Sequence, residues 1–265
     1  FKNGAINFET EEVKFRLDEK GKPLDVYVKV RKDAHKLIEE FMLLANKKVA
    51  EFVYKINEKD QKHPFVYRVH DAPNEDKISE FSKFLKRFNL SINAANQKTL
   101  ASSFNDLLKE IEGKPQQNIL QSMAIRTMAK AFYTSKKSGH YGLAFQYYSH
   151  FTSPIRRYPD VMAHRLLFDY LNDHKNPDIK NLEERCKHSS AMELKAADAE
   201  RASIKYKQAE YLQNFIGRVF PGIISGITEW GIYVELIDNK CEGMIRLNSI
   251  FDDHYMLDEK EQAIV

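Results

Sequence analysis

The sequence predicts an α+β fold in which a larger unit of mixed helices and strands is followed by a small, partial β-barrel. Three observations indicate this. Apolar and polar residues alternate near the start of the chain, apolar residues recur at helical spacing through its middle, and glycine and β-branched residues gather after Gly217. We therefore expect two domains, one at residues 1–214 and a smaller one at residues 215–265.

The first predicted element is a β-hairpin. Residues 11–17 alternate between polar and apolar side chains, and residues 18–21 (Asp-Glu-Lys-Gly) have the composition of a turn. Residues 24–30 then return to an extended, β-branched pattern. Two such runs joined by a short polar segment are typical of paired antiparallel strands.

Helices dominate the middle of the chain. From about Asp33 to near Asn57, apolar residues recur at helical spacing, which predicts a long helix whose apolar side faces a core. Residues 63–70 are predicted to form a short extended stretch, and residues 143–148 either a strand or an ordered loop. Further helices are expected at residues 76–88, 119–133, 161–171 and 182–215.

Composition excludes several classes of protein. Hydrophobic residues make up 43% of the 265 residues and aromatic residues 12%, which is typical of a globular protein rather than a disordered one. No apolar run approaches the roughly 20 residues of a membrane span, and no signal-peptide pattern opens the chain. Cys186 and Cys241 lie far apart without metal-ligand spacing, which favours a reducing, cytoplasmic setting. Both ends, at Phe1 and Val265, are interpreted as cuts.

The strongest functional motif lies at residues 148–160 (YSHFTSPIRRYPD), followed by HRLL at residues 164–167. A proline-stiffened loop there presents two adjacent guanidinium groups, those of Arg156 and Arg157, beside hydroxyl groups and histidines. Arginine can hold a phosphate through two parallel hydrogen bonds, and it can stabilise the charge that builds on oxygen in a transition state. The alternative is that the two arginines form ordinary surface or structural salt bridges.

This motif resembles the carboxy-terminal signature of the RNB catalytic domain found in RNase II and RNase R enzymes, and it is closest to the RNase R branch. Further resemblances follow the order of that family and lie within residues 4–15, 34–46, 64–77 and 199–201. The resemblance implies the carboxy-terminal part of an RNB domain within a processive 3′-to-5′ exoribonuclease. Such a hydrolase would convert single-stranded RNA to nucleoside 5′-monophosphates.

The resemblance also implies roles for individual residues. Arg156 would be catalytic and would clamp the phosphate being cut, in a narrow RNA passage, whereas Arg157 is the weaker candidate and would bind RNA. Glu200, and one of Glu39 or Glu40 with Glu40 preferred, would accept hydrogen bonds from ribose hydroxyls, which distinguish RNA from DNA. The alternative for each glutamate is an ordinary surface charge on a helix.

Aromatic residues would add base stacking. Phe8 would stack on a base, or it would be a core residue of a strand. Residues 220–247 resemble the start of the OB-fold RNA-binding module first named from ribosomal protein S-one, in which Trp230, Tyr233 and Arg246 would bind RNA. The alternative for Trp230 is a core residue at the barrel edge. An OB barrel has five strands and the sequence predicts about three, so we expect a partial barrel.

The acidic metal site implied by the resemblance is not found in the sequence. Two-metal phosphodiester cleavage needs clustered carboxylates around Mg²⁺, and the family's aspartates would lie upstream of the matched region. The nearest acidic groups, Asp71 with Asp76 and Asp252–Asp253 with Asp258, are interpreted as structural. We therefore predict no metal site in this chain, which should be inactive alone, and Mg²⁺ bound by residues outside it in the complete enzyme.

Three functions remain open. The chain is part of an exoribonuclease, or a non-catalytic RNA-binding relative that regulates or chaperones RNA, or a scaffold whose RNA features are incidental. Single-stranded RNA is the expected partner in the first two cases, and no membrane contact is expected in any. The sequence predicts no oligomeric state.

Overall fold

The computed structural model describes residues 4–6, 8, 12–60, 63–114, 116–173, 180–251, 255–258 and 263–264. The chain forms two compact units. We call the first the core unit, which comprises residues 1–8, 31–110 and 124–196, and the second the barrel unit, which comprises residues 9–30, 111–123 and 197–265. Because these units group residues by packing, the domain boundary between residues 214 and 215 stays a prediction.

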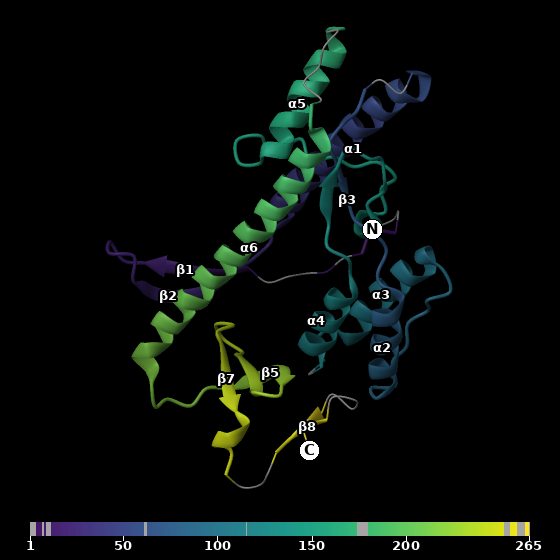
Figure 1. The fold of residues 1–265 in the computed structure, drawn as a ribbon. Helices are drawn as coiled ribbons and strands as arrows, with labels where there is room; N and C mark the ends of the chain where they lie inside the picture. The colour runs from purple at the N-terminus through teal and green to yellow at the C-terminus, as the bar shows by residue number, and fades with distance from the viewer. Residues whose placement is uncertain are drawn as a thin grey trace. The chain divides into compact units, whose positions relative to one another are not determined.

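The core unit contains a short antiparallel strand pair with helices packed against it (Figure 1). Strand β3 (Tyr67–Val69) pairs with β4 (Phe132–Thr134). Helices α1 (Asp33–Asp60) and α5 (Tyr158–Leu171) and the first part of α6 (Leu182–Leu212) contribute to one hydrophobic cluster with these strands. Its buried members are Ala50, Val53, Phe65, Val66, Tyr67, Val69, Tyr133, Met162, Ala163, Leu166, Tyr170, Leu182 and Cys186.

A pair of helices, α2 (Glu75–Lys86) and α3 (Gln97–Ile111), forms another part of the core unit. The α2 helix begins after Asn74, whose side chain accepts a hydrogen bond from the backbone N–H of Lys77 at 3.1 Å. Phe81 of α2 and Phe104 of α3 are buried and stack with ring centroids 6.2 Å apart. This aromatic contact holds the two helices together.

Two predictions in this region are corrected by the structure. The helix predicted at residues 119–133 ends at Thr127, as helix α4 (Gln117–Thr127), because residues 132–134 instead form strand β4. No element was predicted between the helices expected at residues 76–88 and 119–133, and this stretch contains α3. The apolar residues of α3 do recur at helical spacing and are buried: Leu100, Phe104, Leu107 and Ile111. Their pattern was diluted by the serine, asparagine and lysine residues between them.

Helix α1 was predicted to turn its whole apolar side to a core, and this is wrong for its first half. Ile38 is 59% exposed and Phe41 61% exposed, whereas Ala50 and Val53 are fully buried. Residues 143–148, which the sequence left open between a strand and a loop, form an ordered loop. It follows a short 3₁₀ turn, η1 (Tyr141–Leu143), and is tied by an isolated bridge between His140 and Phe145.

The barrel unit contains the predicted hairpin and a three-stranded sheet. Strand β1 (Glu12–Leu17) pairs with β2 (Pro23–Lys29), and the Asp18 carboxylate caps their turn by accepting from the backbone N–H groups of Lys20 and Lys22. Strands β5 (Gly222–Thr228), β6 (Gly231–Leu236) and β7 (Glu242–Arg246) form an antiparallel sheet in that order, and β8 (Leu257–Asp258) pairs separately with β9 (Ala263–Ile264).

These strands agree with the partial OB-fold predicted for the end of the chain. Gly231 is needed where β6 meets β7, because a side chain there would collide with the backbone carbonyl oxygen of Ile245. Within the described ranges, no helix has both the length and the apolar character required to cross a membrane.

Candidate functional site

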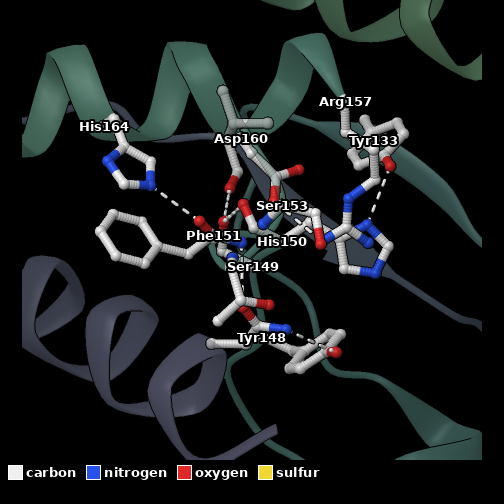
Figure 2. A network of polar contacts seen from close by, with 12 residues as sticks. Tyr133, Tyr148, Ser149, His150, Phe151, Ser153, Arg157, Asp160 and His164 are labelled. Carbon is white, nitrogen blue, oxygen red and sulfur yellow. Dashed lines mark hydrogen bonds and ion pairs between the residues drawn. The ribbon is translucent and has the colours of Figure 1, made fainter. Parts of the chain in front are cut away.

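The loop that carries the two arginines lies in the core unit just before α5, and a buried carboxylate organises it (Figure 2). Asp160, in the first turn of α5, is fully buried. Its Oδ1 atom accepts a hydrogen bond from the backbone N–H of Ser153 at 2.7 Å and another from Nη2 of Arg157 at 2.8 Å. One oxygen atom therefore fixes both the backbone and a side chain of the loop.

Helix α1 holds the same loop through a buried amide. The Asn46 side chain is only 3% exposed, and its Oδ1 atom accepts from the backbone N–H groups of Phe151 at 2.9 Å and Thr152 at 3.2 Å. Its Nδ2 donates to the hydroxyl group of Tyr148 at 3.1 Å. Because buried amides are costly to leave unpaired, these contacts favour one loop conformation.

Further contacts come from α5 and from the residues beside β3. The imidazole of His164 lies 3.8 Å from the Phe151 ring, centroid to centroid and nearly parallel to it, and its Nε2 atom is 2.7 Å from the Phe151 carbonyl oxygen. The buried Ser149 hydroxyl donates to the carbonyl oxygen of Val66 at 2.6 Å. The loop is thus held from three sides by residues of one unit.

A second polar network continues from His150. Its Nδ1 atom is 2.8 Å from the Tyr133 hydroxyl group, and the Arg68 guanidinium lies over the Tyr133 ring at 4.5 Å while it pairs with Glu193 at 2.5 Å. Burial lowers the pKa of His150 to about 2, and the nearby charges of Arg157, Arg68 and other groups, Arg156 among them, act in the same direction. His150 is therefore neutral, and its Nδ1 atom can accept a hydrogen bond from the Tyr133 hydroxyl group.

The two adjacent arginines have opposite environments. Arg157 has 18% of its side chain exposed and pairs with Asp160, which matches the structural alternative stated for the pair. Arg156 is exposed, and its side chain makes no hydrogen bond or ion pair with any residue in the described ranges. The Arg156 guanidinium is therefore free to bind a ligand, while an RNA contact of Arg157 stays a prediction.

The groove that the structure shows between α1 and α5 is not the narrow passage expected around Arg156. A groove of about 500 Å³ lies between α1 and α5, where its lining includes Phe52 and Leu171 but not Arg156. The passage stays a prediction.

Two further predicted residues lie in the core unit: Glu40 on α1, and Phe8 near the start of the chain. Glu40 is exposed and has no ion pair with a described residue, whereas Glu39 pairs with Arg31. The free carboxylate is therefore that of Glu40, the residue preferred for ribose binding. Phe8 is half-buried, with an edge-on ring contact to Phe104 at 6.4 Å, which supports the packing alternative. RNA contacts of Glu40 and Phe8 stay predictions.

The remaining predicted residues lie in the barrel unit. Glu200 is exposed on α6, and Trp230, just before β6, is 69% exposed, so it is not a core residue of the described sheet. Tyr233 lies opposite Met244, and Arg246 lies opposite Gly231, two residues from Tyr233. Tyr233 and Arg246 therefore share one face of the sheet. Their RNA contacts remain predictions.

The absence of a metal site, which the sequence predicts, concerns acidic residues that the structure describes only in part. In the part of the chain that the structure describes, no three histidine, cysteine or acidic side chains are grouped to bind an ion. Asp76 lies in the first turn of α2, where a carboxylate stabilises the helix. Asp252 and Asp253 fall outside the described residues.

Sequence reasoning did not single out Asn46, Tyr133 or Asp160 as parts of the site. Asp160 lies inside the motif, three residues after Arg157 at the start of a predicted helix. This spacing could have indicated an ion pair between the two side chains. Asn46 lies in the segment at residues 34–46 that resembles the family, but no spacing indicated that it or Tyr133 contacts the loop, because both reach it from other elements.

Comparisons with known proteins identify the family of the chain. The RNB domain model matches residues 1–173, and the S1 RNA binding domain model matches residues 213–264. Ribonuclease R of Aquifex aeolicus is 36% identical over 265 residues, which cover 99% of this chain and 37% of that protein. Ribonuclease R 1 of Lactococcus lactis is 36% identical over 276 residues, which cover 100% of this chain and 32% of that protein.

A solved structure, that of Mycoplasma genitalium RNase R in complex with ribose-methylated single-stranded RNA, is also similar. It superposes with a TM-score of 0.89 at 28% identity, covering 99% of this chain and 41% of the other. The chain thus spans about a third of the length of the curated relatives that it matches.

Proposed function

The chain belongs to the RNB-domain family and resembles its ribonuclease R members, and from this premise we propose that it forms the phosphate-binding part of an exoribonuclease. The complete enzyme would degrade single-stranded RNA processively from its 3′ end. One observation carries the proposal: a rigidly held loop presents an exposed arginine, Arg156, that has no described protein partner.

Arg156 would act on the phosphate that is being cut. A guanidinium group can offer two parallel N–H donors to phosphate oxygens, and its charge stabilises the negative charge that develops in the transition state. Such a group contributes most when it is already in position, because no reorganisation is then needed during the reaction. The contacts of Asn46 and Asp160 with the loop provide this preorganisation.

The metal-dependent part of the reaction would lie outside this chain. We propose that carboxylates elsewhere in the complete enzyme bind Mg²⁺, that the products are nucleoside 5′-monophosphates, and that the chain alone does not hydrolyse RNA. Both cysteines are buried and unpaired, which supports a reducing location such as the cytoplasm.

Ribose and base contacts would come from both units. Glu40 and Glu200 are exposed carboxylates that can accept hydrogen bonds from 2′-hydroxyl groups. Trp230 is an exposed ring available for base stacking, with Tyr233 and Arg246 on a common sheet face.

The test of the proposal is Arg156→Ala in the full-length protein, assayed on a labelled single-stranded RNA. Because the clamp acts mainly in the transition state, we expect kcat to fall by roughly 100-fold or more while RNA affinity changes little. Arg165→Ala, which removes an exposed arginine on the same helix, α5, is the matched control and should leave kcat unchanged.

Equal losses of turnover and affinity would show that Arg156 only binds RNA. A full-length protein that binds RNA without cleaving it would instead support the non-catalytic relative.

A further inference from the structure

We propose that Asp160 is a positioning residue for Arg156, and that Arg157 is the counter-charge that allows this carboxylate to be buried. The inference rests on the function proposed above, since it concerns how the phosphate clamp is held. It assigns a role in the reaction to a residue that does not itself touch RNA, and it gives the two adjacent arginines different tasks.

The backbone around Arg156 is closed into a turn by a single oxygen atom. The N–H groups of Arg156 and Arg157 both donate to the carbonyl oxygen of Ser153, at 3.3 and 3.1 Å. The N–H of Ser153 donates in turn to Oδ1 of Asp160 at 2.7 Å. Asp160 therefore fixes the turn from which the Arg156 side chain projects, without restricting that side chain.

The position of Asp160 explains why a carboxylate is tolerated there. It lies in the first turn of α5, where the helix dipole favours negative charge, but it is fully buried. A buried carboxylate needs a charged partner, and Nη2 of Arg157 supplies one at 2.8 Å.

The link between the two charged groups depends on Oδ1 alone. The other carboxylate oxygen, Oδ2, and the Nε atom of Arg157 are buried and have no hydrogen-bond partner in the described part of the chain. The same Oδ1 atom thus serves the Ser153 N–H and the Arg157 guanidinium. Loss of its charge would free Arg157 and loosen the turn together, and both changes would displace Arg156.

The test is a double-mutant cycle on kcat in the full-length protein. Arg156→Ala removes the clamp, and Asp160→Asn keeps an oxygen for the Ser153 N–H while it removes the charge that holds Arg157. We expect Asp160→Asn to lower kcat roughly 10- to 100-fold with little change in KM, because small displacements of a catalytic group have effects of this size. In the Arg156→Ala background, Asp160→Asn should lower kcat no further.

Asp198→Asn is the matched control. Asp198 forms a pair of the same spacing with Arg201 at 2.6 Å, but this pair is exposed on α6, so kcat should not change. If Asp160→Asn alone does not fold, the variant Arg157→Gln with Asp160→Asn replaces the ion pair by two neutral amides. It should show the same lack of additivity with Arg156→Ala.

The outcomes separate the inference from the function on which it rests. The positioning role would be overturned if the kcat losses of Arg156→Ala and Asp160→Asn multiply in the double variant. An unchanged kcat in a folded Asp160→Asn variant would overturn it as well, and in both cases the Arg156 clamp would stand. A fully active Arg156→Ala variant would overturn the clamp, and the inference with it.

Discussion

At the scale of single residues, the environment of a side chain decides its role more than its type does. Arg156 and Arg157 are chemically identical neighbours, yet one is exposed and the other pairs with a buried carboxylate. The sequence could indicate phosphate chemistry in this loop, because paired guanidinium groups beside hydroxyls suit it. Residue pattern alone could not show that the two arginines have different environments. That difference depends on the burial of Asp160, and burial is a tertiary property.

His150 makes the stability of the core unit sensitive to acid. Burial lowers the pKa of His150 to about 2, while an unfolded histidine has a pKa of about 6.5. Between these values the unfolded chain binds a proton that the folded chain does not, so the stabilising contribution is present above about pH 6.5. It is lost progressively as the pH falls, by at most about 1.4 kcal/mol per pH unit.

We therefore expect His150→Gln to weaken the pH dependence of stability. The amide can still meet the Tyr133 hydroxyl group but does not titrate. Urea unfolding at pH values from 7 down to 5 should show a shallower loss of stability in this variant than in the wild type, with His35→Gln as an exposed control. Parallel profiles for wild type and His150→Gln would contradict the prediction.

Among the helices and strands, the pattern of the sequence predicted correctly those elements that local interactions determine. The β1–β2 hairpin, α5 and α6 match the predictions closely, because their apolar periods and turn residues are clear. Residues 132 and 133 were wrongly assigned to a helix, since the strand that they form depends on pairing with β3, far away in the sequence. The exposed start of α1 could not be predicted either, because its apolar period alone does not show what covers it.

Helix α3 gives a stability prediction at this scale. Phe104 is fully buried between Phe8 and Phe81, and its ring contacts both. Phe104→Ala would remove these contacts and leave a cavity, so we expect the free energy of unfolding to fall by about 3–5 kcal/mol. Circular dichroism during urea unfolding measures this.

The matched control is Phe41→Ala, because Phe41 is 61% exposed on α1 and its loss should change stability by less than about 0.5 kcal/mol. Equal losses for the two variants would mean that α3 is not packed as described.

For the whole molecule, the resemblance of its motifs to a known family predicted more than the periodicity of its residues did. The α+β class and the partial barrel follow from periodicity, but the RNB family follows from the motif at residues 148–160, and the family models agree with it. The formal net charge is only +3, so the total charge does not indicate a nucleic-acid partner. In the proposed function, RNA would be bound by local groups such as Arg156 and Arg246, which are exposed.

This dependence on a few local charges makes the salt dependence of binding the decisive measurement for the chain itself. Each phosphate contact releases counterions, and for a single strand it contributes a slope of about −0.7 in log affinity against log salt. We expect fluorescence anisotropy to show affinity for single-stranded RNA that falls as salt rises, and Arg246→Ala, which removes an exposed arginine predicted to bind RNA, to make the slope shallower by about 0.7. Arg165→Ala is the control and should leave the slope unchanged, since no RNA contact is predicted for it. A folded chain with no salt-sensitive binding would favour the scaffold alternative, because phosphate contacts cannot be insensitive to salt.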